Sequence, residues 1–354
     1  MLDALTAAFT GAPWPLYLLI YLMIGWALIR PTGPLWDRFV SVIGWPIELM
    51  QRLQGATGLP YLFLLPNMII FGLFTFAPMF INMGFSLTDG QSILFSERGW
   101  AGLDNLRRLL SETQIDTGAA NLEDDKFLAS VYSTATFVIF QVPIMVAVAL
   151  ASALALNRDI VARGLWRAVF FYPVMLSPVV VGFLWSLILK RQGVLSQTLL
   201  GWGWIDAPIQ WLTDPSWTMF WSVFVYTWAH LGFYMLILLA GLQAIPRDVY
   251  EAAEMDGTPA WRQLTHITIP LLAPTLLVVT VLSLVKAFQA FEELYAMSVR
   301  WTSLVGYIFE TSGLRGQPTA NGLGIAAMAS LLVAVVLIML SLVQVYLSQK
   351  SSKP

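Results

Sequence analysis

Long apolar segments separated by short polar stretches constrain this chain more than any other feature. Of its 354 residues, 58% are hydrophobic and only 11% are charged, whereas a soluble domain has roughly 45–50% apolar and 25% charged residues. A helix that crosses a bilayer needs about 20 predominantly apolar residues. The sequence therefore predicts an all-α integral membrane protein.

Seven segments are predicted to span the membrane, and the first of them is rather short. No Lys or Arg precedes that first segment, so it lacks the basic region of a cleaved signal peptide and is expected to be retained. Residues 36–53 mix apolar and charged side chains, which favours a helix lying along the membrane surface. The predicted spans are 14–29, 61–85, 127–156, 168–189, 217–243, 271–298 and 322–347.

The distribution of charge predicts an orientation. Placing the polar segment 244–270 in the cytoplasm gives a net charge of +3 inside and −4 outside. The short loop 157–167 contains three arginines, and short loops carry most of the positive-inside signal. Seven spans with an external N-terminus fit this distribution.

Composition excludes several kinds of chemistry. Cysteine is absent, so the chain has no disulfide framework, thiolate metal site or cysteine nucleophile. Its two histidines, His230 and His266, have no convincing carboxylate partner in the sequence, so no metal site is predicted. The chain also lacks a G-x-x-x-x-G-K-[ST] motif. No cofactor is therefore expected in this chain, and any ATP must bind to another subunit.

The segment 244–270 is the one long polar insert that has the signals of a folded element. Pro246 favours a helix start, and Gly257 can end that helix in a left-handed conformation. Thr258 and the proline after it favour the start of a second helix, and Pro270 marks the next expected boundary. These signals predict two short helices joined by a bend.

This segment resembles the EAA loop of ABC importer permeases, the cytoplasmic element that docks on the ATPase subunit. The resemblance lies in Glu251-Ala252-Ala253, Gly257, Ile267 and Pro270. An amphipathic linker without a partner is the alternative. The resemblance implies that the ATPase-coupling face is formed by Glu251, Ala252, Ala253, Asp256 and Gly257.

Four further segments look like parts of the carbohydrate-type ABC permeases, the group that contains the maltose permease. They are 102–110, 170–181, 211–215 and 241–253. The resemblance implies an extra helix and a surface helix over 1–60, a six-span permease domain over 61–347 with its coupling loop at 244–270, and a cytoplasmic tail over 348–354.

The resemblance also implies a function and partners. The chain is expected to be the non-catalytic permease subunit of an importer that moves a carbohydrate or polyol across the bacterial inner membrane. Its expected partners are a second permease subunit, an ABC ATPase dimer that binds ATP and Mg²⁺, an extracytoplasmic solute-binding protein and membrane lipid. No nucleic-acid partner is expected.

Three residues in the span 217–243 are candidates for contact with solute. Tyr226, Trp228 and His230 lie about 20–25 Å from the cytoplasmic end of a helix that rises 1.5 Å per residue. Aromatic belts usually sit at the membrane interfaces instead, and a ring near the midplane can stack on a sugar. These positions align with a sugar-contacting segment of the maltose permease, although simple helix packing would also explain them.

A second set of candidates follows from treating 271–298 as one helix. Ser283, Lys286, Ala290 and Glu293 would then share one face, with Ala287 and Gln289 nearby. A charged Lys286 inside the bilayer is costly, so it should face a cavity or a partner, or else extend its ammonium group to the outer interface. Ser283 and Ala287 also align with sugar-lining positions of the maltose permease.

Other functions remain open at this stage. The solute could be a glycerol derivative or another small polar compound. The chain could instead be an ion-coupled secondary transporter that uses Lys286 and Glu293. A membrane-embedded enzyme is disfavoured because no cluster of His, Asp or Glu converges at one depth.

Overall fold

The computed structural model describes residues 41, 44–45, 59–90, 92–111, 126–313 and 322–351. The predicted first span and nearly all of the predicted surface helix lie outside the described residues. The chain divides into two compact units, residues 1–81 and 82–354.

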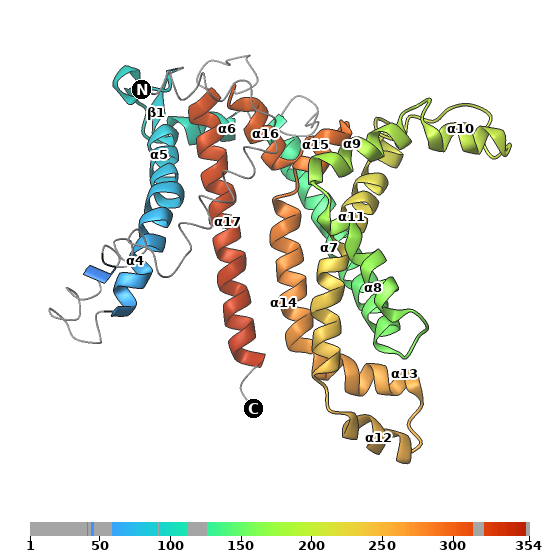
Figure 1. Ribbon diagram of the computed structural model, residues 1–354. Helices are drawn as coiled ribbons and strands as arrows, with labels where there is room; N and C mark the ends of the chain where they lie inside the picture. Colours follow the sequence, from blue (N-terminus) through green and yellow to red (C-terminus); the bar gives the residue numbers. More distant parts are fainter. Residues whose placement is uncertain are drawn as a thin grey trace, which may run out of the picture. The chain divides into compact units, whose positions relative to one another are not determined.

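Six helical stretches in the described part of the chain are long and apolar enough to cross a membrane. Figure 1 shows a predominantly helical protein, which confirms the predicted fold class. Four stretches agree with predicted spans to within three residues, and two differ. The six stretches are 64–86, 126–157, 178–201, 215–243, 260–288 and 322–346.

The first described span begins in the N-terminal unit. Helix α4 (Leu59–Phe71) continues through a π-helical turn, η2 (Gly72–Phe76), into α5 (Ala77–Ser86). Nearly all its side chains between residues 64 and 81 are exposed. Such a continuous apolar surface suits lipid or another membrane subunit as its neighbour.

Arg98 organises the segment that follows this span. Strands β1 (Thr88–Asp89) and β2 (Gly99–Trp100) pair in antiparallel register. The Arg98 side chain, which is buried, donates to Thr88 Oγ1 at 2.8 Å and to the carbonyls of Gly90 and Ser92. These charge-assisted hydrogen bonds stabilise the turn between β1 and β2, whose own pairing involves only two residues in each strand.

Helix α6 (Asp104–Ser111) is attached to the same segment. The buried Asn105 amide donates to the Ser86 carbonyl at 2.8 Å and to the Thr88 carbonyl at 3.0 Å. Arg108 lies 2.9 Å from Asp89, and its hydrogen bond lowers the pKa of the Asp89 carboxyl. Polar side chains therefore fix α6 against the hairpin.

Helices α7 (Lys126–Asn157), α11 (Pro215–Gln243) and α14 (Ile269–Phe288) pack together and form the main core. Helix α11 starts at a proline, which suits the first helical position. The Asp214 side chain caps this end by accepting a hydrogen bond from the Ser216 N–H at 2.9 Å. The largest cluster of buried residues comprises Met145, Ala149, Ala153, Leu156, Leu231, Tyr234, Met235, Leu238, Leu239, Leu242, Leu272 and Val279.

The predicted single span over 168–189 is wrong, because the helix is interrupted at Pro173 and Pro178. Helix α8 (Arg163–Phe171) leads through a 3₁₀ turn, η4 (Tyr172–Met175), to α9 (Pro178–Leu189). Leu176 and Ser177 are extended. For Ser177 this follows from Pro178, because a proline disfavours the helical conformation in the residue before it. A turn then leads to α10 (Val194–Gly201).

The predicted boundary at Pro270 is also wrong. Helix α13 (Ala260–Arg262) continues through a π-helical turn, η5 (Gln263–Thr268), into α14 without interruption. The Ile269 N–H donates to the Leu264 carbonyl, five residues earlier. We attribute the continuity to this widened turn, which accommodates the proline ring where a regular helix would clash.

The predicted span over 271–298 ends early for a different reason. Helix α14 stops at Phe288, and a separate short helix, α15 (Glu292–Met297), begins after an irregular residue at Phe291. Helix α16 (Leu304–Thr311) follows, and α17 (Gly322–Ser351) is the last helix of the chain. The expected stripe through Ser283, Lys286, Ala290 and Glu293 therefore does not exist as one helical face.

Candidate functional site

The segment 244–270 has the predicted bend. Helix α12 (Arg247–Met255) ends where Gly257 adopts a left-handed conformation with φ +68°. The Gly257 N–H donates to the Glu254 carbonyl, and the Thr258 N–H donates to the Ala253 carbonyl, each at 2.9 Å. This capping pattern satisfies carbonyls at the helix end and needs a residue without a Cβ penalty. The role expected of Gly257 in the backbone is confirmed.

The two arms of this segment form a fixed unit with an exposed tip. The Tyr250 hydroxyl lies 3.1 Å from Thr268 Oγ1 in the second arm, and Ala253 is buried. Glu251, Ala252, Asp256 and Gly257 are exposed. Met255 at 89% exposure and Trp261 at 62% make the tip apolar as well as acidic. Figure 1 shows α12 and α13 beyond the ends of α11 and α14.

A polar cluster joins three helices in the interior. The Tyr226 and His230 rings of α11 stack with their centroids 4.3 Å apart. His230 Nε2 lies 3.4 Å from Glu293 Oε1 of α15, and the Tyr226 hydroxyl donates to the Lys286 carbonyl at the end of α14 at 2.9 Å. The cluster therefore connects the end of α14 and the start of α15 to α11.

The other predicted solute residues are dispersed around this cluster. Ser283 and Ala287 are buried within α14, and Trp228 packs against Trp185 of α9 with ring centroids 5.7 Å apart. The Lys286 and Gln289 side chains are exposed. The structure thus brings Tyr226, His230 and Glu293 together by their side chains and Lys286 by its backbone.

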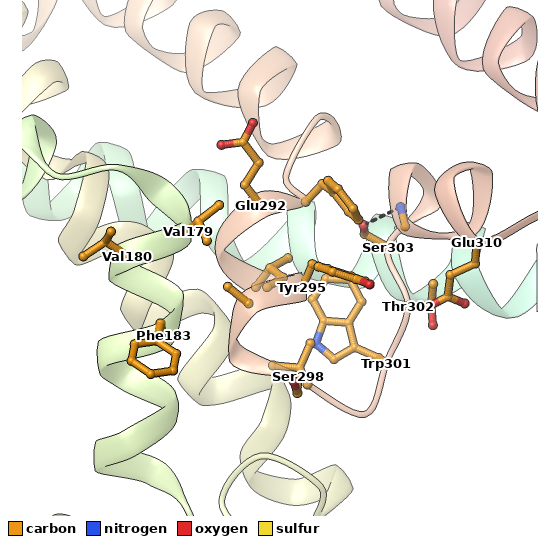
Figure 2. A pocket seen from close by; sticks show the side chains of 15 residues that line it. Val179, Val180, Phe183, Glu292, Tyr295, Ser298, Trp301, Thr302, Ser303 and Glu310 are labelled. Atoms are coloured by element: carbon orange, nitrogen blue, oxygen red, sulfur yellow. Dashed lines mark hydrogen bonds between the residues drawn. The ribbon is translucent and has the colours of Figure 1, made fainter. Parts of the chain in front are cut away.

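A cavity of ≈ 660 Å³ lies beside this cluster, and its residues were not predicted as a site. Figure 2 shows the Tyr295 and Trp301 rings near its centre, with Glu310 beside Thr302 and Glu292 apart from them. These residues follow the helix break, where the sequence has neither a regular period nor a known motif. Its lining comes from Val179, Val180, Phe183, Phe291, Glu292, Leu294, Tyr295, Ala296, Ser298, Val299, Trp301, Thr302, Ser303, Gly306 and Glu310.

Glycine permits the close contact between α9 and α15 that forms one wall of the cavity. A Cβ at Gly182 would lie 2.7 Å from the Ala296 Cβ and directly against the Glu293 carbonyl oxygen. The two helices therefore touch through backbone at Gly182. Among the residues that the structure describes, no group of three His, Asp or Glu is arranged to hold a metal ion.

Comparison with known proteins gives one matching family. The family model for the binding-protein-dependent transport system inner membrane component matches residues 125–353. The lactose transport system permease protein LacF of Rhizobium radiobacter is 33% identical over 247 residues, covering 70% of this chain and 77% of that protein. The trehalose/maltose transport system permease protein MalF of Thermococcus litoralis is 30% identical over 240 residues, covering 68% and 77%.

A solved structure has the same fold. A chain from a bacterial ABC transporter involved in the import of the acidic polysaccharide alginate aligns with a TM-score of 0.66 at 23% identity. The alignment covers 87% of this chain and 99% of that one. A second structure of an alginate ABC transporter, in complex with an alginate pentasaccharide-bound periplasmic protein, gives the same TM-score.

Proposed function

Since this chain belongs to the family of binding-protein-dependent transport system inner membrane components, we propose that it is the permease of an importer for a carbohydrate or polyol. The observation that carries the proposal is its similarity, at 33% and 30% identity, to permeases named for lactose and for trehalose and maltose transport. A glycerol derivative or another small polar solute is the second candidate. The chain is a multi-pass inner-membrane protein with six apolar helices in its described part.

The proposal assigns ATP hydrolysis to other subunits. A second permease and an ABC ATPase dimer, which binds ATP and Mg²⁺, would complete the importer, and an extracytoplasmic binding protein would deliver the solute. Glu251, Ala252, Ala253, Asp256 and Gly257 would enter the ATPase cleft. Their support is the exposed, internally braced tip of the coupling segment. For transport to occur, each nucleotide state must favour one arrangement of the helices over the other.

The proposed solute path passes the interior cluster. Tyr226, Trp228, His230 and Glu293 would form one side, and Ser283, Lys286, Ala287 and Gln289 the other. Tyr226, Ser283, Ala287 and Glu293 are buried here, so solute reaches them only when α14 or α15 moves relative to α11. The His230–Glu293 pair would then separate or follow the moving helix. Ionisable side chains that meet inside a membrane typically mark a functional site.

The test is to purify the tagged chain from its native membrane in mild detergent and identify its partners by mass. ATP hydrolysis is then measured with and without the binding protein and candidate sugars. A P-loop subunit, a second permease and sugar-stimulated hydrolysis are the expected result. A chain that purifies alone and transports sugar in liposomes under an ion gradient would contradict the proposal. It would favour the secondary transporter, with Lys286 and Glu293 as its ion-coupled pair.

A further inference from the structure

We propose that the cavity between α9, α15 and α16 is a second saccharide subsite, and that it selects neutral or amino-bearing sugars against acidic ones. The subsite is distinct from the interior cluster, because Glu292 lines the cavity whereas the adjacent Glu293 is buried against His230. The inference rests on the proposed function only in taking a saccharide as the ligand. A cavity of ≈ 660 Å³ lies within the range of sites that hold small ligands.

The cavity has aromatic rings that are fixed before any ligand arrives. The Trp301 indole N–H donates to Ser222 Oγ at 3.0 Å, and its ring packs 5.4 Å from that of Phe137. Tyr295 is held between Phe291 and Phe309, with centroid distances of 5.0 and 5.5 Å. Rings that are already held in place lose little conformational entropy on binding, and their apolar faces suit the C–H face of a sugar ring.

The charges and hydroxyls of the lining indicate which sugars fit. Among the described residues that line the cavity, Glu292 and Glu310 are exposed, Ser298 and Thr302 carry hydroxyls, and there is no Lys, Arg or His. A carboxylate can accept two hydrogen bonds from neighbouring hydroxyls or pair with an ammonium group. A uronate would meet a like charge at Glu292 or at Glu310, and the described residues of the lining offer no cation to pair with it. The cavity is therefore suited to neutral sugars and, more strongly, to amino sugars.

The helices that carry these residues make the subsite sensitive to transport movements. Val179, Val180 and Phe183 of α9 line the cavity together with residues of α15. The same α15 holds Glu293 against His230 of α11. A displacement of α15 that opens the interior cluster must also change the width of this cavity. The subsite can therefore hold a sugar in one state and release it in another.

The test measures binding to the purified full chain in detergent by saturation-transfer difference NMR. The probes are maltotriose, the glucosamine trimer and trigalacturonate, which are neutral, cationic and anionic. We expect the glucosamine trimer to bind most tightly and trigalacturonate least. The double variant E292Q/E310Q should reduce the preference for the cationic over the neutral trimer by roughly threefold to tenfold, as expected for exposed charge pairs. The variant E97Q makes the same kind of charge change outside the cavity and should keep the wild-type preference.

A substitution of Tyr295 tests the stacking surface separately from the charges. Tyr295→Ala should weaken binding of the neutral and cationic trimers alike, because it removes a stacking surface and no charge. Equal binding of trigalacturonate, an unchanged preference in E292Q/E310Q, or no binding of any trimer would overturn the subsite. None of these results depends on ATP hydrolysis, so the importer proposal stands or falls separately on the purified complex.

Discussion

Replacing Gly182 by alanine tests whether backbone contact between α9 and α15 positions the cavity and the interior cluster. The new Cβ would lie 2.7 Å from the Ala296 Cβ and against the Glu293 carbonyl oxygen. Ordinary carbon contacts are about 3.5–4.0 Å, so α15 must move away by about 1 Å. Overpacking of this kind typically costs about 1–3 kcal/mol. Neither neighbouring atom is the far end of a flexible side chain, so little of this strain can be relieved by a rotamer change.

The assay is thermal unfolding of the purified chain in detergent, followed by loss of the monodisperse species. We expect G182A to lower the apparent Tm by about 2–10 °C, from the cost of overpacking and the usual relation between stability and Tm. The matched control is Gly164→Ala in α8, where the added Cβ meets no atom within 4 Å. Alanine is a better helix former than glycine, so G164A should leave Tm unchanged or raise it slightly.

Equal melting temperatures for G182A and the wild type would refute this reasoning. A fall in G164A as large as that in G182A would refute it too, because the loss would then follow from the alanine and not from the helix contact. If α15 is displaced as expected, G182A should also change affinity for the trisaccharide probes, whereas G164A should not.

Three other predictions concern the bend at Gly257 and residues 88–111. Gly257→Val forces a β-branched residue to φ +68° and should abolish solute-stimulated ATPase activity while membrane insertion is retained; full stimulation would contradict the coupling role. Arg98→Met removes the donors that hold the β1–β2 turn and should cost about 1–3 kcal/mol locally, seen as faster proteolysis within 88–111. The Asp89 pKa is lowered, chiefly by the hydrogen bond from Arg108, so its contribution to stability is present above the ordinary value of 3.8 and is lost as pH falls below it. Proteolysis of the same segment should therefore accelerate below that pH in the wild type and depend less on pH in D89N.

The sequence was sufficient for features that a few neighbouring residues determine. The start of α11 follows from Asp214 and the proline after it, and the left-handed bend follows from Gly257. The apolar spans were recognisable because their length is a property of the bilayer. The effect of the prolines was harder to predict. Pro173 and Pro178 interrupt the helix, whereas Pro270 lies inside a continuous helix. The difference depends on a π-helical turn whose hydrogen bonds no local pattern predicts.

The break between α14 and α15 shows why the site was only partly predictable. Residues 288–291 contain neither glycine nor proline, so their sequence favours continuation of the helix. The helix ends instead, and the Tyr226 hydroxyl donates a hydrogen bond to the Lys286 carbonyl at the end of α14. This carbonyl is one of those that a helix end leaves without a backbone donor. His230 of the same helix pairs with Glu293 in the new helix. Tyr226 and His230 both lie about 60 residues before the break, so no pattern near residues 288–291 indicates these contacts. The same two side chains therefore end one helix and hold the next, whose first residue, Glu292, lines the cavity, so any movement that separates α15 from Tyr226 and His230 must also change the shape of that cavity.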